Sequence, residues 1–175
     1  MDFAFLAMPL ENKVWVDNTA SADVAALTIQ ALRDGISVVC SNKIAATQSM
    51  DDWRSIQLAS RLGRVFFQHE TNVGAALPIL RSLRDMLATG DQIQAIEGVL
   101  SGSLNYIFSS MDNGASFESA VEQAVKLGFA EPDARLDLSG RDVARKILIL
   151  ARTCGAALEM DHVAIQGFMK VGAMD

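Results

Sequence analysis

Residues 1–70 alternate short apolar runs with longer amphipathic stretches. The apolar runs lie at residues 14–16, 36–40 and 65–67, and the stretches at 22–33 and 50–62 have helical composition. The runs predict strands, and the stretches between them predict helices. Apolar strands that alternate with helices are typical of a parallel sheet covered by helices. We therefore expect an α/β fold whose first part is built on a parallel sheet.

The pattern changes after residue 70. A loop of small residues spans 71–76, and Pro78 is suited to open a helix that runs to Leu87. Residues 92–100 alternate and predict a strand, whereas the apolar spacing at 104–111, 117–127 and 140–152 predicts helices. Helices packed on a smaller sheet would make the second part an α+β domain. We place the domain boundary between residues 70 and 71.

Composition narrows the classes of function. The chain has 175 residues, half of them hydrophobic, and a net charge of −6, which argues against nucleic acid as the main partner. Cys40 and Cys154 make no disulfide framework and are expected to be reduced core thiols. No apolar run is long enough for a bilayer, and the apolar run at 3–8 lacks a basic leader. We expect a cytoplasmic protein without a membrane partner.

The stretch from Glu131 to Lys146 is the richest in candidate chemistry. Asp142 and Lys146 are four residues apart on a predicted helix, for which Ser139 is a candidate N-cap. Glu131 and Asp137 precede that helix and can fold back over its first turn. Such a set can bind a small zwitterion and transfer a proton. The alternative is an ordinary surface ion pair beside an acidic loop.

Two polar residues follow the ends of predicted strands. Thr19 follows the first strand and Lys43 the second, where a nucleotide-binding sheet places its ligand. Thr19 is suited to bind a nicotinamide amide or ribose, and Lys43 a substrate or a phosphate. The alternatives are a helix cap at Thr19 and a solvated Lys43. The sequence contains no Gly-x-Gly-x-x-Gly turn for a coenzyme phosphate.

A further candidate is a site for a hard cation in the loop after residue 69. Glu70 offers a carboxylate, and Gly74 frees loop carbonyls that can coordinate a sodium-like ion. An ordinary loop before a helix is the alternative. His69 and His162 lack partners at ligand spacing, so no zinc site is predicted.

Six segments together resemble homoserine dehydrogenase, especially the dehydrogenase portion of bifunctional aspartokinase/homoserine dehydrogenase. They occur in the order of that family and cover roughly residues 14 to 160. The segments are Val-Asp-Asn-Thr-Ala-Ser at 16–21, Val-Cys-Ser-Asn-Lys at 39–43, His-Glu-Thr-Asn-Val-Gly-Ala-Ala-Leu-Pro at 69–78, Gly-Val-Leu-Ser-Gly-Ser-Leu-Asn-Tyr-Ile at 98–107, Leu-Gly-Phe-Ala-Glu-Pro-Asp at 127–133 and Asp-Leu-Ser-Gly-Arg-Asp-Val-Ala-Arg-Lys at 137–146.

The resemblance implies a fold and a reaction. Residues 1–70 would be a partial Rossmann-like nucleotide-binding domain without its glycine-rich turn, and 71–175 a catalytic and dimerisation domain. The chain would be truncated at both ends relative to the family. The family interconverts L-homoserine and L-aspartate 4-semialdehyde with NADP or NAD, in threonine and methionine biosynthesis. A homodimer or higher homo-oligomer is implied, with residues 92–100 at its interface.

The resemblance also implies roles for matched residues. Lys146 and Lys43 would be catalytic, with Lys146 as the proton donor and Lys43 close to coenzyme and substrate. The remaining matches fall into three groups: Glu131, Asp137 and Asp142 for the substrate, Thr19 and Gly128 for the coenzyme, and Glu70 with the carbonyls of Val73, Ala75 and Leu77 for a sodium ion.

Two other readings compete with an NAD(P)-dependent enzyme. The first is a catalytically inactive assembly module that dimerises without coenzyme. The second is a related enzyme that attacks the same aldehyde through a cysteine nucleophile, for which Cys40 is the candidate. Preference between NADP and NAD cannot be predicted, because the residue that decides it would lie upstream.

Overall fold

A computed structural model describes residues 11–130 and 133–166 of the chain. The contacts divide the chain into two units. The first comprises Met1–Gln92 and Leu148–Glu159, and the second comprises Ile93–Ile147 and Met160–Asp175. The first unit therefore extends beyond residue 70, and a functional boundary at 70/71 stays a prediction. No helix in the described residues is long and apolar enough to cross a bilayer.

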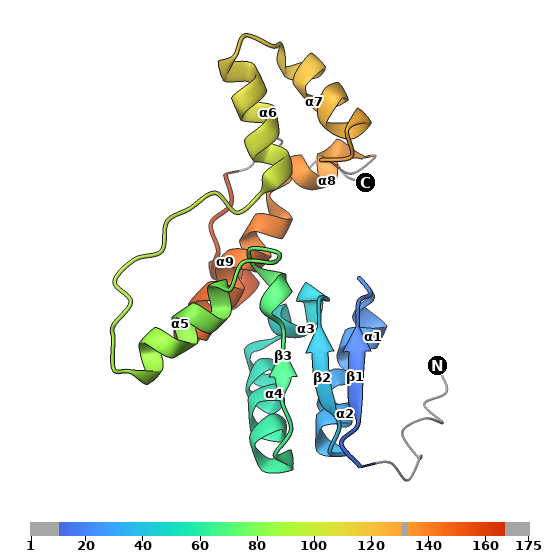
Figure 1. Cartoon of the computed structure of the whole chain (residues 1–175), viewed down its shortest axis with the longest axis vertical. Helices are drawn as coiled ribbons and strands as arrows, with labels where there is room; N and C mark the ends of the chain where they lie inside the picture. The colour runs from blue at the N-terminus through green and yellow to red at the C-terminus, as the bar shows by residue number, and fades with distance from the viewer. Residues whose placement is uncertain (1–10, 131–132, 167–175) are drawn as a thin grey trace. The chain divides into compact units, whose positions relative to one another are not determined.

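The first unit contains a parallel sheet of three strands. β1 (Val14–Asp17), β2 (Ser37–Cys40) and β3 (Phe67–Gln68) lie in the order β1-β2-β3, with Val16 opposite Val39 (Figure 1). Both pairings are parallel, as the alternation of strands and helices predicted. The expected α/β fold is confirmed for this unit.

The helices between the strands differ in detail from the prediction. In place of one helix over 22–33, the chain forms α1 (Ala22–Ala26) and α2 (Thr28–Arg33), which meet at Leu27. A short helix that was not predicted, α3 (Lys43–Thr47), follows β2. α4 (Met50–Gly63) agrees with its prediction and packs against α2. Arg64 follows as its C-cap, and the left-handed backbone of Arg64 stops the helix.

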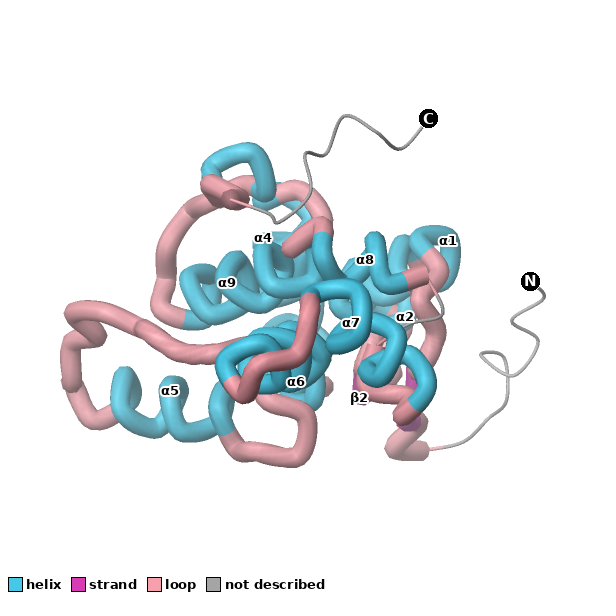
Figure 2. The backbone as a smooth tube through the Cα atoms, turned by 90° about the horizontal axis from the view of Figure 1, so that it is seen from above, coloured by secondary structure: helices cyan, strands magenta, loops and turns pink. Residues whose placement is uncertain are grey.

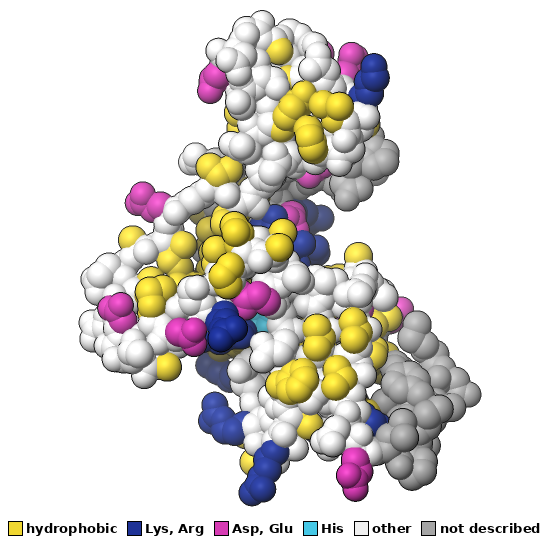
Figure 3. All heavy atoms as spheres, viewed as in Figure 1, with side chains coloured by type: hydrophobic (Ala, Val, Ile, Leu, Met, Phe, Trp, Pro, Cys, Tyr) yellow, Lys and Arg dark blue, Asp and Glu magenta, His cyan; other side chains and the backbone are white. Residues whose placement is uncertain are grey.

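The described helices cover one face of the sheet, and no described element covers the other face. Ile36, just before β2, and Val38 and Cys40 within it alternate with residues of the other face and are buried. On the opposite face Val14 and Val16 are 52% and 54% exposed. Apolar side chains accordingly gather over the strands on the side turned to the viewer in Figure 3. The predicted covering of the sheet is therefore present on one face of the described structure.

His69 lies in an aromatic cluster under α4. Its ring stacks on Phe67 at 4.9 Å between centroids and meets the edge of Trp53 at 5.6 Å. Nη2 of Arg84 lies 2.9 Å from Nε2 of His69. Burial, and then the charge of Arg84, lower the pKa of His69 to about 3. His69 is thus a neutral part of the core.

Arg152 joins the end of α9 (Arg141–Thr153) to the rest of the first unit. Its side chain is fully buried and donates to the carbonyl oxygens of Ala46, Gln48 and Leu158 at 2.8–3.1 Å. It also pairs with Glu159 at 3.0 Å. Burial lowers the pKa of Arg152, although Glu159 opposes the shift. Five donors in a planar group suit this set of oxygens.

A tight loop leads from β3 into α5 (Ile79–Ala88). Gly74 has φ +80°, and a Cβ added there would lie 2.5 Å from Cγ1 of Ile79, so the turn requires glycine. A short 3-10 helix, η2 (Glu70–Asn72), precedes the turn. Pro78 was predicted as the first helical residue, but it is the N-cap of α5, which begins one position later at Ile79.

The strand predicted over residues 92–100 is wrong for this chain. These residues form no regular element, and Val99 is 75% exposed. A strand requires a neighbour for its backbone N–H and C=O groups, and no strand is present in the described part of the second unit. The alternation of apolar and polar residues was therefore not enough to predict a strand here. The α+β character expected of this domain is not present in the described residues.

The second unit is helical where it is described. α6 (Gly102–Asp112) and α7 (Phe117–Lys126) form an antiparallel hairpin and lie side by side in Figures 1 and 2. Ile107, Ala120 and Ala124 are fully buried between them. The small alanines of α7 permit close packing against α6. Ser101 and Ser116 cap the two helices at their N-termini.

The acidic stretch before α9 is partly helical. Instead of a loop, residues 134–138 form the short helix α8 (Ala134–Leu138), capped by Asp133. Ser139 accepts from the amide of Arg141 at 3.3 Å, but it is the C-cap of α8 and lies two residues before the first residue of α9, so its predicted N-cap role is not confirmed. On α9 the buried residues are Ala144, Leu148, Ile149, Leu150 and Arg152, whereas Ile147 of the predicted stripe is 37% exposed. A further 3-10 helix, η3 (Met160–His162), follows.

Candidate active site

A polar pocket of about 750 Å³ opens in the second unit. One wall is α6 together with the residues that cap its two ends, and the others come from the turn after α7, from α8 and from α9. The lining residues are Ser101, Gly102, Ser103, Asn105, Tyr106, Ser109, Ser110, Asn113, Gly128, Phe129, Asp137, Asp142 and Lys146. The pocket therefore brings together four residues predicted from sequence: Gly128, Asp137, Asp142 and Lys146.

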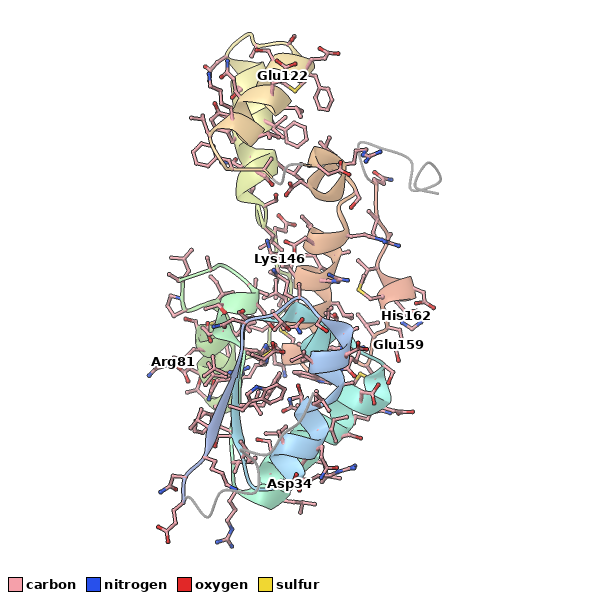
Figure 4. All side chains as sticks on the ribbon, turned by 90° about the vertical axis from the view of Figure 1, so that its right-hand side faces the viewer. Asp34, Arg81, Glu122, Lys146, Glu159 and His162 are labelled. Atoms are coloured by element: carbon pink, nitrogen blue, oxygen red, sulfur yellow. The ribbon has the colours of Figure 1, made fainter. Side chains whose placement is uncertain are left out.

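Lys146 is the ammonium group of this pocket. Its Nζ lies 2.7 Å from Oδ2 of Asp142 and donates to the carbonyl oxygen of Leu100 at 2.7 Å. The Lys146 side chain is 17% exposed, whereas that of Asp142 is 47% exposed. Figure 4 labels Lys146 on α9. An ammonium has three N–H groups, so two fixed partners leave one for a ligand oxygen. The lysine is thus mostly buried, whereas its carboxylate partner stays partly exposed.

Asp137 is held by a serine from the opposite wall. Oγ of Ser103 donates to Oδ1 of Asp137 at 2.8 Å, and Oγ of Ser101 lies 3.0 Å from Oγ of Ser103. Sequence reasoning missed both serines and the Leu100 carbonyl. A small polar residue immediately before an apolar helical stretch was the available signal for Ser101, because that pattern is typical of an N-cap.

Of two further residues predicted for this site, one lies outside the described residues and the other lines the pocket. Glu131 lies outside the described residues. Gly128 has φ +74° and lines the pocket in the turn after α7.

A second cavity in the same unit is apolar. It has a volume of about 390 Å³ and is lined by side chains such as Leu104, Phe108 and Val143. It contains no acidic or basic side chain, so it is a poorer candidate for chemistry.

Thr19 and Lys43 belong to the first unit, at the carboxyl ends of β1 and β2. Thr19 is exposed, and its amide and hydroxyl both donate to Oδ1 of Asp17, at 2.9 and 2.8 Å. Lys43 is half-buried and is the first residue of α3. Ser21, and not Thr19, caps α1, so the alternative reading of Thr19 as a cap is wrong. The roles of Thr19 and Lys43 in binding a coenzyme stay predictions.

Asp17 and Asn42 form a buried polar cluster that sequence reasoning did not identify. Asn42 donates to Oδ2 of Asp17 at 3.1 Å and to the carbonyl oxygen of Ser21 at 3.0 Å. Its own Oδ1 accepts from the amide of Ile44 and caps α3. These bonds tie the two loops after β1 and β2 to each other, at the edge where ligands of parallel sheets bind.

Cys40 is an inert thiol. It is 1% exposed, and burial together with the charge of Asp17 raises its pKa to about 12. A thiolate is the nucleophilic form of cysteine, so this environment opposes the cysteine mechanism. Cys154 is half-buried, and burial raises its pKa as well. Both cysteines are free thiols, as predicted, but only Cys40 is buried in the core.

Glu70 has a structural role in the described protein. Its carboxylate accepts from the amides of Leu80 at 2.8 Å and Arg81 at 3.0 Å, and so caps α5. Val73 is buried, Leu77 is 61% exposed, and Ala75 has φ +52° in the loop. A sodium site at Glu70 and the carbonyls of Val73, Ala75 and Leu77 stays a prediction. Among the described residues, no three His, Cys, Asp or Glu side chains cluster as metal ligands.

Comparisons with known proteins agree on one family. A sequence model described as homoserine dehydrogenase matches residues 78–175. The bifunctional aspartokinase/homoserine dehydrogenase of Haemophilus influenzae is 43% identical over 164 residues, which are 94% of this chain and 20% of that protein. The homoserine dehydrogenase of Saccharomyces cerevisiae is 41% identical over 150 residues, which are 83% of this chain and 42% of that protein.

Solved structures show the same likeness. A hyperthermophilic archaeal homoserine dehydrogenase in complex with NADPH has a TM-score of 0.72 and 29% identity, over 81% of this chain and 43% of that one. A protein of unknown function from Candida auris has a TM-score of 0.85 and 35% identity, over 92% of this chain and 47% of that one.

The chain thus spans less than half of the length of each of these relatives. The family model covers more than half of the chain, and the quoted motifs at 98–107, 127–133 and 137–146 each contribute residues to the pocket that holds Lys146. The chain belongs to the homoserine dehydrogenase family.

Proposed function

We propose that this chain carries the substrate site of an NAD(P)-dependent homoserine dehydrogenase, which interconverts L-homoserine and L-aspartate 4-semialdehyde. The observation that supports the proposal most is the position of Lys146 between Asp142 and the Leu100 carbonyl in a polar pocket. An ammonium held in this way can protonate an oxygen that becomes negative during reduction.

The proposed reduction adds one hydride and one proton to the aldehyde group. A bound nicotinamide coenzyme supplies the hydride to the aldehyde carbon. The remaining N–H of Lys146 donates to the aldehyde oxygen, and the proton moves to that oxygen as the C=O bond becomes a C–O single bond. Lysine then regains a proton from water. Asp137 and Asp142 can accept from the ammonium of the amino-acid substrate.

A bound coenzyme would need contacts to its phosphates in addition to those that Thr19 and Lys43 can offer. Thr19 and Lys43 lie at the correct edge of the sheet for a nucleotide, and a structural neighbour was solved with NADPH. The sequence has no Gly-x-Gly-x-x-Gly turn to bind the coenzyme phosphates. We propose that residues 1–70 form a partial nucleotide-binding domain and residues 71–175 the catalytic and dimerisation domain.

We also propose self-association through residues 92–100. Ile96 and Val99 are 39% and 75% exposed in this segment, which forms no regular element. Exposed apolar residues on an extended segment favour pairing with a second copy. Sedimentation at increasing concentration would show a dimer, and Val99→Asp would shift it toward the monomer. A monomer at all concentrations would contradict this part.

The experiment that tests the function is coenzyme reduction with L-homoserine as substrate, in the intact protein that carries this chain. We expect NADP⁺ or NAD⁺ to be reduced only when L-homoserine is present. A thermal-shift titration with each coenzyme separates this function from a purely assembling module, because a bound coenzyme raises the melting temperature. A folded protein with neither turnover nor a shift at about 100 times the expected Kd would contradict the proposal.

A further inference from the structure

Two serines at the start of α6 connect the helix terminus to Asp137. Oγ of Ser101 accepts from the amide of Leu104 at 3.2 Å and lies 3.0 Å from Oγ of Ser103. Ser103 in turn donates to Oδ1 of Asp137 at 2.8 Å. Ser103 is buried, and all three polar side chains line the pocket of Lys146.

The direction of these hydrogen bonds follows from the chemistry of the groups. An ionised carboxylate only accepts, so the single proton of Ser103 points at Asp137. Ser103 can then only accept from Ser101, whose proton must point at Ser103. The amide of Leu104 completes the sequence by donating to Ser101. The hydrogen bonds therefore form a series in which each group donates to the next, from the amide of Leu104 through both serines to Asp137.

We infer that Ser101 and Ser103 are positioning residues that hold Asp137 in the pocket, and that Ser103 favours an ammonium group in the ligand. The inference deepens the proposed function and rests on it. The proton of Ser103 is committed to Asp137, and one of its lone pairs is committed to Ser101. Only a lone pair remains for a ligand, so Ser103 accepts and does not donate.

This arrangement gives the pocket groups of two chemical kinds. Ser103 and Asp137 offer oxygen acceptors, whereas Lys146 offers a donor. A substrate with a cationic amine and a reacting oxygen satisfies both kinds of group. An analogue without the amine leaves the acceptors of Ser103 and Asp137 without a ligand donor and gains nothing from their position.

The test compares two substrates in the intact protein: L-homoserine and 4-hydroxybutanoate, which lacks the amine. We expect Ser103→Ala to raise KM for L-homoserine about tenfold while kcat changes less than about twofold. For 4-hydroxybutanoate, kcat/KM should stay within about twofold of the parent, because no amine contact exists to be lost. Ser103→Thr keeps the hydroxyl and should restore the parental KM.

Ser116→Ala is the matched control. Ser116 caps α7 through the amide of Ser119 at 3.2 Å, the same bond length as that of Ser101 to Leu104, but it is not in the pocket. It should leave both substrates unaffected. If Ser103→Ala does not fold by circular dichroism, Ser101→Ala carries the test, with a smaller rise of KM, about threefold.

Three results would overturn the inference: an unchanged KM for L-homoserine, a parallel loss with both substrates, or no rescue by threonine. A parallel loss would indicate a purely structural serine. Absence of L-homoserine turnover in the parent protein would instead refute the proposed function, and the inference would fall with it.

Discussion

The ammonium of Lys146 lies 2.7 Å from the carboxylate of Asp142, one turn earlier on α9. The sequence spacing placed these residues on one side of a helix, and the structure adds the Leu100 carbonyl as a second acceptor. The lysine is therefore held from two directions, by its own helix and by the segment before α6.

Asp142→Asn should lower kcat/KM for L-homoserine by at least about tenfold. The amide keeps the shape of the side chain but removes the charge that orients Lys146 and accepts from the substrate amine. Steady-state kinetics would measure the loss, with Asp112→Asn as the control, because Asp112 is an exposed acid at the end of α6. Unchanged kinetics in Asp142→Asn would show that the ion pair has no part in turnover.

The unfolding free energy should depend on pH through His69. Its pKa is lowered from the usual 6.5 to about 3 in the folded protein, so the unfolded chain binds the extra proton between these values. The stability that His69 contributes is thus present above pH 6.5 and is lost as the pH falls toward 3. The loss is at most about 1.4 kcal/mol per pH unit in that window.

Denaturant titrations across this range would test the dependence on His69. His69→Gln keeps a polar acceptor near Arg84 but does not titrate, so its stability should change less with pH than that of the parent. The difference between the two proteins removes the contribution of the other acidic groups. Parallel pH profiles for parent and variant would contradict the assignment.

The Cys40 thiol should resist alkylation in the folded protein. With its pKa raised to about 12 and the residue 1% exposed, the reactive thiolate is scarce and shielded. Iodoacetamide labelling read by mass spectrometry should modify Cys154 first and Cys40 only after denaturation. Cys40→Ser should retain turnover, whereas loss of activity in a folded Cys40→Ser protein would revive the cysteine mechanism.

Arg152→Met should cost about 3 kcal/mol or more of unfolding free energy. The change leaves the buried carbonyl oxygens of Ala46, Gln48 and Leu158 without the donor that satisfies them. Chemical denaturation would compare it with Arg54→Met, which removes an exposed ion pair to Asp51 and should cost less than about 0.5 kcal/mol. Equal costs for the two variants would contradict the structural role of Arg152.

The parts of the fold that the sequence predicted are those with a strong periodic signal. Strands β1 and β2 and the helices α4, α6, α7 and α9 follow from apolar runs and helical spacing. The short helices α3 and α8 were missed, because five residues are too few to show a period. The strand expected at 92–100 failed since its alternation has no partner strand in the described second unit.

The sequence likewise predicted only those contacts of the candidate site that lie close together along the chain. Asp142 and Lys146 are linked by helical spacing, whereas Ser103 and Asp137 are 34 residues apart and meet only through the packing of α6 against α8. Asp17 and Asn42, 25 residues apart, are brought together by the parallel pairing of β1 and β2. Contacts of this kind depend on the tertiary fold and leave no local pattern.

The most direct test of the central claim is the rate of L-homoserine oxidation by the Lys146→Ala variant of the intact protein. If Lys146 transfers the proton, kcat should fall by about a hundredfold or more. Lys126→Ala, on the exposed end of α7, should retain the parental rate. A folded Lys146→Ala protein that oxidises L-homoserine at the parental rate would contradict the account.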